Sequence, residues 1–309
     1  MGKEIHLDCI SSRSMRDSAK DELIAKYGVF SNPLANYRTS HKAAEILEIS
    51  RENIANSLGI IDPEELHFTS GPEESSNWAI KGAAWKMKKD DHKILYSAAE
   101  SIKIKNPIRW ISKSGYKSTL IKIINEQGIN LDLEDLKSKL DKKIAFICIE
   151  HANSELGFVN QMDEIVSLVR EYSPQAKIIC DLSTQIGRGK LDLEKLDIDL
   201  GIIDSQAFGG PNGLGALYIK SGTRIENLVH GDHSEFGRRS GAQNISLISA
   251  MGVAAEEMHR NLEKEVMHIK QITKETNEIV KSIWGECKIN TPENHLKHGI
   301  FNFIPGLIS

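Results

Sequence analysis

Residues 143–182, KIAFICIEHANSELGFVNQMDEIVSLVREYSPQAKIICDL, hold the pattern that decides the fold. The run KIAFICIE at 143–150 is apolar and rich in β-branched residues, as expected of a strand buried on both faces. Residues 162–173 have the apolar spacing of an amphipathic helix, and KIICDL at 177–182 is a second apolar strand. Because a helix between two such strands is the usual crossover between parallel strands, this stretch predicts an α/β protein.

The same alternation continues in both directions along the chain. The remaining predicted helices cover residues 40–58, 73–89 and 131–140, and the remaining predicted strands cover 67–70, 93–97, 198–204 and 214–220. We therefore expect a mostly parallel sheet with helices on both faces. The glycine-rich segment DSQAFGGPNGLGALYIK at 204–220 fits no phosphate-binding motif and predicts a tight hairpin.

The C-terminal part of the chain has a different pattern. Helical periodicity without proline runs from about Asn244 to Ile283, which predicts one bent helix or two that act as a connector. The strand-like run HGIFNFI follows, and a lone strand has little to pair with. We therefore expect residues 1–245 to form a large domain that includes the N-terminal segment of a small domain. Residues 246–309 are then the connecting helix and a truncated small domain.

Composition excludes several classes of function. The 309 residues are 40% hydrophobic and 27% charged, with a net charge of −4, so nothing favours binding to nucleic acid or to an anionic membrane. No apolar run reaches the roughly 20 residues of a membrane span, and MGKEIHLDCISSR lacks the apolar stretch of a signal peptide. The four cysteines are scattered, and Cys148 and Cys180 lie in predicted strands as core residues. These features predict a cytoplasmic protein.

Polar residues follow the two strands that decide the fold. HANSELG at 151–157 follows the first strand, and DLSTQIG at 181–187 overlaps the end of the second. The carboxyl ends of parallel strands line the usual ligand crevice of an open sheet, and Asp181 would place a carboxylate there. Taken alone, an aspartate after a strand is more often a turn or cap residue. Glu73 and Glu74 begin a helix in SGPEESSNW and favour its positive end, so this segment does not predict an anion site.

A third polar segment, HGDHSEFGRRSG at 230–241, contains His230, Asp232 and His233. These residue types can bind zinc or iron, but their spacing fits no standard site. We therefore predict no metal site and keep these three residues as a weak candidate.

Taken together, these segments resemble the cysteine desulfurases of the class V aminotransferase group. Near the N-terminus, the family's "LDYSATT" is similar to HLDCISS here, its "GNP" to SNP, and its "SGATESDNLAIKGAA" to SGPEESSNWAIKGAA. In the middle of the chain, its "HVNNEIGVV" is similar to HANSELGFV, and its "DATQSVGKLPIDL" to DLSTQIGRGKLDL. Farther on, its "SGHKIYGPKGIGALYV" is similar to DSQAFGGPNGLGALYI, and its "HGGGHERGMRSGT" to HGDHSEFGRRSGA. The resemblance runs collinearly from about residue 5 to residue 305. It implies a fold of the pyridoxal-phosphate (PLP) transferase type, fold type I.

The resemblance also shows where this chain departs from the family. Different residues stand here at positions that serve the cofactor in the family. Ala207 replaces the Schiff-base lysine, Gln206 replaces the histidine before it, and Ser101 replaces the histidine that stacks on the ring. Glu73 and Asp204 replace two phosphate-binding hydroxyl residues, and Ala242 replaces a threonine that reaches the partner's cofactor. The family's catalytic cysteine lies on a loop beyond the last residue of this chain. The positions that still match are Asp181 for the pyridine nitrogen, Asn153 and Glu155 in the polar loop, and Arg239.

Charge decides what these departures imply. A PLP phosphate carries about −1.5 to −2, and a carboxylate about 4 Å away repels each unit by roughly 4 kcal/mol at an effective dielectric of 20. With Glu73 and Asp204 in the phosphate cradle, we expect PLP binding to be lost and no cofactor to be bound. Ala207 cannot form an imine, so we expect no catalytic residue and only a vestigial pocket.

The resemblance therefore suggests a catalytically inactive pseudoenzyme that acts by binding or regulating another protein in sulfur transfer or iron–sulfur assembly. Because family members are homodimers, the expected partner is a second copy or a related desulfurase. One alternative is a repurposed small-molecule, amine or metal binder that uses the acidic former pocket. Another is a protein that still binds PLP without a covalent bond.

Overall fold

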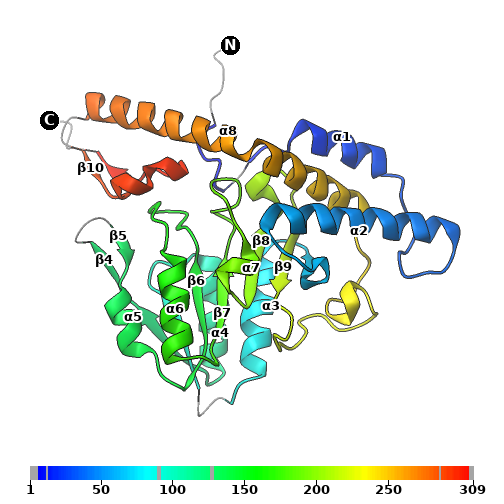
Figure 1. The fold of residues 1–309 in the computed structure, drawn as a ribbon, viewed down its shortest axis with the longest axis horizontal. Helices are drawn as coiled ribbons and strands as arrows, with labels where there is room; N and C mark the ends of the chain where they lie inside the picture. Colours follow the sequence, from blue (N-terminus) through cyan, green and yellow to red (C-terminus); the bar gives the residue numbers. More distant parts are fainter. Residues whose placement is uncertain (1–5, 12, 89–91, 126–128, 285–286, 306–309) are drawn as a thin grey trace.

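The computed structural model describes residues 6–11, 13–88, 92–125, 129–284 and 287–305. A seven-stranded sheet lies at the centre with the strand order β1-β9-β8-β7-β6-β2-β3 (Figure 1). The five strands from β8 to β3 pair in parallel, and β9 and β1 add antiparallel pairs at one edge. The mostly parallel α/β architecture predicted from residues 143–182 is confirmed.

The strands are short, as the sequence predicted. The main sheet contains β1 (Leu66–Thr69), β2 (Lys93–Ser97), β3 (Lys117–Ile121), β6 (Ile144–Glu150), β7 (Lys177–Asp181), β8 (Leu200–Asp204) and β9 (Gly215–Ile219). Two smaller antiparallel pairs are formed by β4 (Ile123–Asn125) with β5 (Ile129–Leu131), and by β10 (Lys288–Ile289) with β11 (Phe303–Ile304).

The α-helices cover the sheet and extend beyond it. They are α1 (Asp17–Lys26), α2 (Arg38–Leu58), α3 (Pro72–Trp85), α4 (Ile102–Lys113), α5 (Leu133–Lys139), α6 (Met162–Tyr172), α7 (Leu193–Leu196) and α8 (Ile245–Ile283). Short 3₁₀ turns are η1 (Pro63–Glu65), η2 (Ser205–Phe208), η3 (Glu235–Gly237) and η4 (Glu293–His298).

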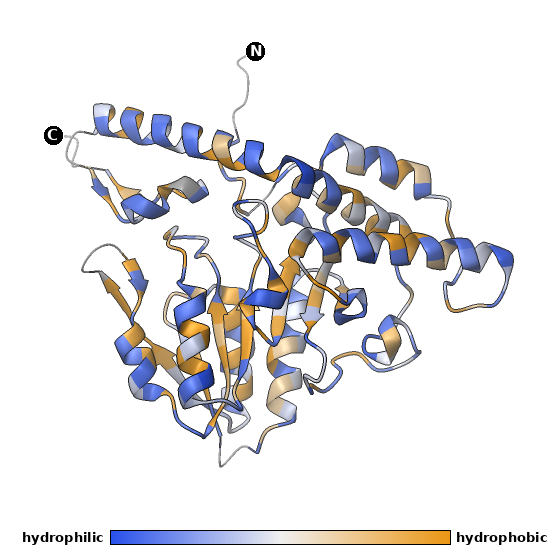
Figure 2. Ribbon diagram, in the orientation of Figure 1, coloured by the Kyte–Doolittle hydropathy of each residue, from blue (hydrophilic) through white to orange (hydrophobic). Residues whose placement is uncertain are grey.

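The core has two layers because successive strand residues face opposite sides of the sheet. Phe146 and Cys148 of β6 pack into the layer that contains α3 and α4, whereas Ile147 and Ile149 pack into the layer that contains α5 and α6. All four side chains are buried, so β6 is apolar on both faces, as Figure 2 shows for the central strands. This accounts for the continuous apolar run instead of an alternating one.

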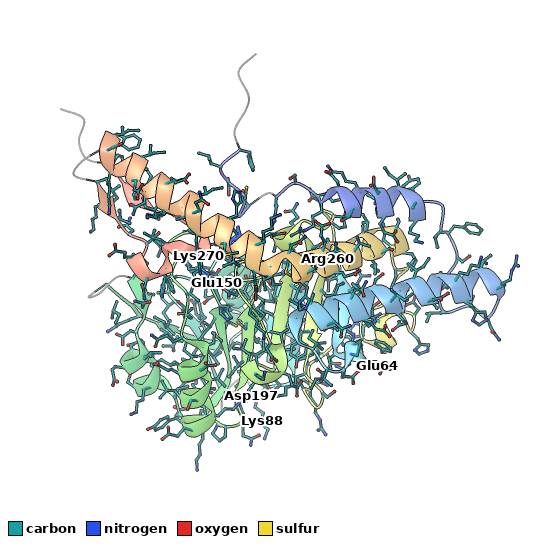
Figure 3. The ribbon with its side chains drawn as sticks, turned by 45° about the horizontal axis from the view of Figure 1, so that its top comes forward. Glu64, Lys88, Glu150, Asp197, Arg260 and Lys270 are labelled. Atoms are coloured by element: carbon teal, nitrogen blue, oxygen red, sulfur yellow. The ribbon has the colours of Figure 1, made fainter. Side chains whose placement is uncertain are left out.

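Helix α8 is a single helix of 39 residues and confirms the periodicity predicted for 244–283. It packs along α1 and α2 at its N-terminal half and contacts η4 farther along. Arg260 and Lys270 mark its course in Figure 3. No helix within the described ranges is long and apolar enough to cross a membrane.

Three expectations differ from the structure. The helix predicted at 73–89 ends at Trp85, and Lys89 lies outside the described residues. The C-terminal strand is not alone, because β11 pairs with β10. Helix α4 was not predicted, since Pro107 lies inside it and proline usually interrupts helices.

Candidate functional site

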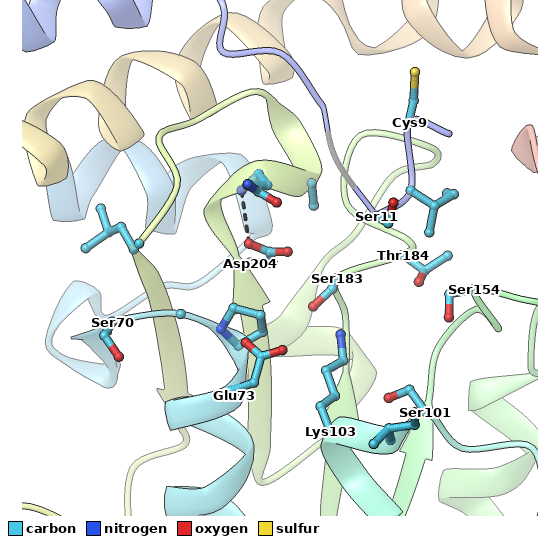
Figure 4. A pocket seen from close by; sticks show the side chains of 18 of the residues that line it. Cys9, Ser11, Ser70, Glu73, Ser101, Lys103, Ser154, Ser183, Thr184 and Asp204 are labelled. Atoms are coloured by element: carbon cyan, nitrogen blue, oxygen red, sulfur yellow. Dashed lines mark hydrogen bonds between the residues drawn. The ribbon is translucent and has the colours of Figure 1, made fainter. Parts of the chain in front are cut away.

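A cavity of about 530 Å³ lies beyond the carboxyl ends of β7 and β8. Its walls come from the N-terminal segment at 9–11, the starts of α3 and α4, and the turns that follow β7 and β8 (Figure 4). The predicted site residues that line it are Glu73, Ser101, Asp204, Gln206 and Ala207. The crevice expected at the strand ends is therefore present, and it brings together residues from distant parts of the chain.

Lys103 is the central side chain of the site, and the sequence did not predict it. It lies in the first turn of α4 and projects into the cavity (Figure 4). Its Nζ lies 2.8 Å from Oδ2 of Asp181, whose side chain is 3% exposed. Burial disfavours the charged form of Lys103, but the attraction of Asp181, Glu150 and Asp204 together outweighs it, so the pKa of Lys103 is raised. Lys103 is thus a protonated ammonium held by a buried carboxylate.

The other oxygen of Asp181 is also occupied. Its Oδ1 accepts hydrogen bonds from the backbone N–H of Ser183 at 3.0 Å and from Ser183 Oγ at 2.7 Å. The turn-residue role weighed for Asp181 is therefore real, and it coexists with the ion pair to Lys103.

Two further buried carboxylates stand behind this pair. Glu150 Oε1 accepts from Ser101 N at 2.7 Å, and Glu100 Oε1 accepts from Glu150 N at 2.9 Å. Burial, and then the nearby charge of Asp181, raises the pKa of Glu150 to about 7. Burial, and then Glu150, raises the pKa of Glu100 well above its usual value. The site therefore contains several acids that compete for few positive charges.

The opposite wall carries Glu73 and Asp204. Asp204 Oδ1 accepts from Gln206 N at 3.0 Å and so caps the turn η2. Burial raises the pKa of Asp204, with repulsion from Asp181 and Glu73 in addition. Ala207 follows within η2, and its carbonyl oxygen accepts from Arg13 Nη1 at 3.2 Å. β8 and β9 do form an antiparallel pair, but the connection between Asp204 and Gly215 contains η2, so the predicted tight hairpin is wrong.

Asn153 and Arg239, two other predicted site residues, have structural contacts. Asn153 Nδ2 donates to Glu150 Oε2 at 3.0 Å, and its Oδ1 accepts from the backbone N–H of Glu155 and Leu156, which shapes the loop. Arg239 forms an ion pair with Glu74, with Nε 2.9 Å from Oε1. Arg239 lines a neighbouring smaller cavity that also includes Ala242.

Of the three candidate metal residues, Asp232 forms hydrogen bonds that stabilise its own loop. Asp232 Oδ1 accepts from the backbone N–H of Ser234 and of Gly241, each at 3.0 Å. His230 and His233 are exposed. Across the part of the chain that the structure describes, no three or more His, Cys, Asp or Glu side chains form a group that could hold a metal ion.

The charge of the cavity also differs from the prediction. Lys103 and Arg188 line it together with Glu73 and Asp204, so two bases face two acids. The acidic residues Glu73 and Asp204 expected in the former pocket are therefore present, and Lys103 and Arg188, which were not predicted, lie beside them. A signal for Lys103 existed, because three buried acids at adjacent strand ends require a compensating cation.

Comparison with known proteins defines the class. Residues 15–306 match the family described as Aminotransferase class-V. The chain is 30% identical over 98% of its length to the cysteine desulfurase IscS of Dictyoglomus turgidum, of which it covers 76%. It is 29% identical over 95% of its length to the cysteine desulfurase IscS of Clostridium botulinum, covering 73% of that protein. A solved structure described as a NifS-like protein superimposes with a TM-score of 0.90 at 26% identity, covering 95% of this chain and 79% of that one.

The chain therefore has the PLP-transferase-like fold and belongs to the class V aminotransferase family, within its cysteine desulfurase group. The sequence resemblance is confirmed at this level.

These relatives correct the cofactor expectation. Cysteine desulfurases are PLP-dependent, so the family points to PLP, and the prediction that this chain takes no cofactor is wrong. The repulsion argument counted only the acids of the cavity, whereas Lys103 and Arg188 also line it.

The side chains fit one end of PLP better than the other. Asp181 is a buried carboxylate suited to a cationic ring nitrogen, although Lys103 holds it in this structure. Ser183 fixes the orientation of that carboxylate. Glu73 and Asp204 at the opposite wall suit a phosphate less well than hydroxyl groups would.

Proposed function

We propose that this desulfurase-like protein does not release sulfur from cysteine itself and works in sulfur transfer by binding another protein. One observation carries the proposal: Ala207 stands on η2 at the wall of the cavity, where the family has the imine-forming lysine. A methyl group can neither form an imine nor transfer a proton.

The contacts of Lys103 support the same proposal. Lys103 is an amine in the cavity, but Asp181 keeps it protonated, and an ammonium has no lone pair for nucleophilic attack. Lys103 thus does not replace the function that Ala207 lacks.

An exposed apolar segment supports the protein-binding part of the proposal. Between α1 and α2, Tyr27 is 81% exposed, Phe30 is 90% exposed and Tyr37 is 53% exposed. Aromatic side chains are enriched in protein interfaces, and so many in 11 residues are costly to leave in water. We propose that this segment, residues 27–37, binds a second chain of the same fold, and that the second chain is another copy of this protein.

The proposal includes a cytoplasmic location. Cys9, Cys148, Cys180 and Cys287 are free thiols, which suits a reducing compartment.

The activity is tested by measuring sulfide release from cysteine with PLP added, with an active cysteine desulfurase of the family as positive control. We expect no release above that of free PLP. Turnover well above this background would overturn the proposed lack of activity.

The contact is tested by sedimentation of the wild type and of a Tyr27→Asp/Phe30→Asp variant. We expect the variant to dissociate at protein concentrations where the wild type is dimeric. Ile279→Asp on α8, where Ile279 is 57% exposed, serves as the control and should leave the dimer intact. A monomeric wild type contradicts the self-association proposal, and the sulfide assay is independent of that result.

A further inference from the structure

Both carboxylate oxygens of Asp181, behind the cavity, already have partners within the protein. Asp181 accepts from Ser183 through Oδ1 and from the Lys103 ammonium through Oδ2. The carboxylate is 3% exposed, so water does not compete for it effectively. A ligand that carries a cationic N–H can therefore reach Asp181 only by replacing Lys103.

We propose that Lys103 is an internal competitor that controls which ligands the cavity accepts. Its ammonium occupies the position on Asp181 that the cationic nitrogen of a ligand, such as a protonated pyridine ring, would take. The cavity accepts such a ligand when the Lys103 side chain withdraws. This inference goes beyond the proposed function and does not depend on it.

The position of Lys103 makes withdrawal feasible without unfolding. Its side chain is 19% exposed and borders an open cavity, and the four-carbon stem of a lysine is flexible. Asp204 and Glu150 also stabilise its positive charge, so the ammonium has other acids nearby when it leaves Asp181. A moved lysine would at the same time reduce the negative charge of the wall that carries Asp204.

The competition predicts a selective gain in binding when Lys103 is removed. The probe is pyridoxamine 5′-phosphate, which has the ring nitrogen but lacks the aldehyde and so forms no imine with surface lysines. We expect Lys103→Ala to bind it at least about tenfold more tightly than the wild type, because breaking a buried ion pair no longer accompanies binding. Fluorescence titration or equilibrium dialysis measures the difference.

Three controls make the gain specific. Lys113→Ala, an exposed lysine at the other end of α4, should leave affinity unchanged. Benzyl phosphate has no ring nitrogen and should bind Lys103→Ala no more tightly than the wild type. The double variant Lys103→Ala/Asp181→Asn should lose the gain, because the counter-ion for the ring nitrogen is gone. A folded Lys103→Ala variant without tighter binding, or a gain that persists without Asp181, overturns the proposal.

A second measurement uses the wild type and so does not depend on the variant folding. Acetic anhydride should modify Lys103 slowly in the free protein, because the ammonium is paired and enclosed. Saturating pyridoxamine 5′-phosphate should increase the labelling of Lys103, measured by peptide mass spectrometry, and leave that of Lys113 unchanged. Labelling of Lys103 that stays constant or falls when the probe binds contradicts displacement.

Discussion

Glu150 lies directly opposite Asp181 in the parallel pairing of β6 with β7, so two buried carboxylates share adjacent strand ends. Glu100 adds a third through its hydrogen bond to the backbone of Glu150. Of these three acids, and within the residues that the structure describes, only Asp181 lies at ion-pair distance from Lys103. The mismatch between acids and bases has measurable consequences for stability.

Glu150→Gln should stabilise the protein more at pH 8 than at pH 5. The pKa of Glu150 is about 7 in the folded chain, above its ordinary value of 4.5. Between these values the folded state holds a proton that the unfolded state has lost, so the wild type loses stability as the pH rises through this window. Glutamine stays neutral at both pH values. Urea unfolding at pH 5 and pH 8 measures the difference, with the exposed Glu155→Gln as control. If the difference in unfolding free energy between Glu150→Gln and the wild type does not increase from pH 5 to pH 8, the raised pKa of Glu150 is contradicted.

Glu235→Ala should destabilise the fold by about 3–5 kcal/mol, because it leaves the buried charge of Arg51 with only the half-exposed Glu48 as ionic partner. Arg51 Nη1 lies 3.0 Å from Glu235 Oε2, and the side chains are 1% and 0% exposed. Phe68 N also donates to Glu235. The exposed pair of Lys274 with Glu278 is the matched control, and Glu278→Ala should change stability by less than about 1 kcal/mol. Similar losses in the two variants in chemical denaturation would argue against a special role for the buried pair.

Gly82→Ala should destabilise by about 1–3 kcal/mol, although alanine normally favours helices. A Cβ at Gly82 in α3 would lie 2.4 Å from the carbonyl oxygen of Glu226. Gly28→Ala is the control because nothing lies within 4 Å of its added Cβ. Thermal unfolding compares the stability of the two variants. If Gly82→Ala leaves the stability unchanged, the backbone around Glu226 moves aside easily and the prediction is wrong.

Cysteine labelling should separate the exposed Cys9 from the buried Cys148 and Cys180. Burial raises the pKa of the Cys148 and Cys180 thiols well above the usual value, so little thiolate forms. Cys9 is exposed. A disulfide reagent at pH 8 should react with Cys9 first and reach Cys148 and Cys180 only after denaturant is added. Rapid reaction of all four thiols in the native protein would contradict the buried positions of β6 and β7.

The sequence predicted six of the seven strands of the main sheet because they are largely apolar, whereas the exposed edge strand β3 was not predicted. The predicted strand at 93–97 coincides with β2, and the one at 143–150 differs from β6 by one residue. Helix α4 was missed because Pro107 masks an apolar face made by Ile104, Ile108 and Ile111, three or four residues apart.

The same omission explains why the site was only partly predicted. Glu73, Asp204 and Ala207, which the family motifs align with cofactor positions, line one cavity, and their role there stays a prediction. Lys103 belongs to the unpredicted helix, and no motif marks it. Its ion pair with Asp181, 78 residues away in the sequence, forms only when the chain folds.

The pair of Lys103 with Asp181 has a consequence for how this protein is made in the cell. The positive charge that balances Asp181 is covalently part of the chain, so it is present at a fixed one-to-one ratio as soon as translation is complete. Closing the sheet around that carboxylate therefore needs no small molecule to arrive first. The yield of folded protein should accordingly be insensitive to the supply of vitamin B6, whichever ligand later enters the cavity.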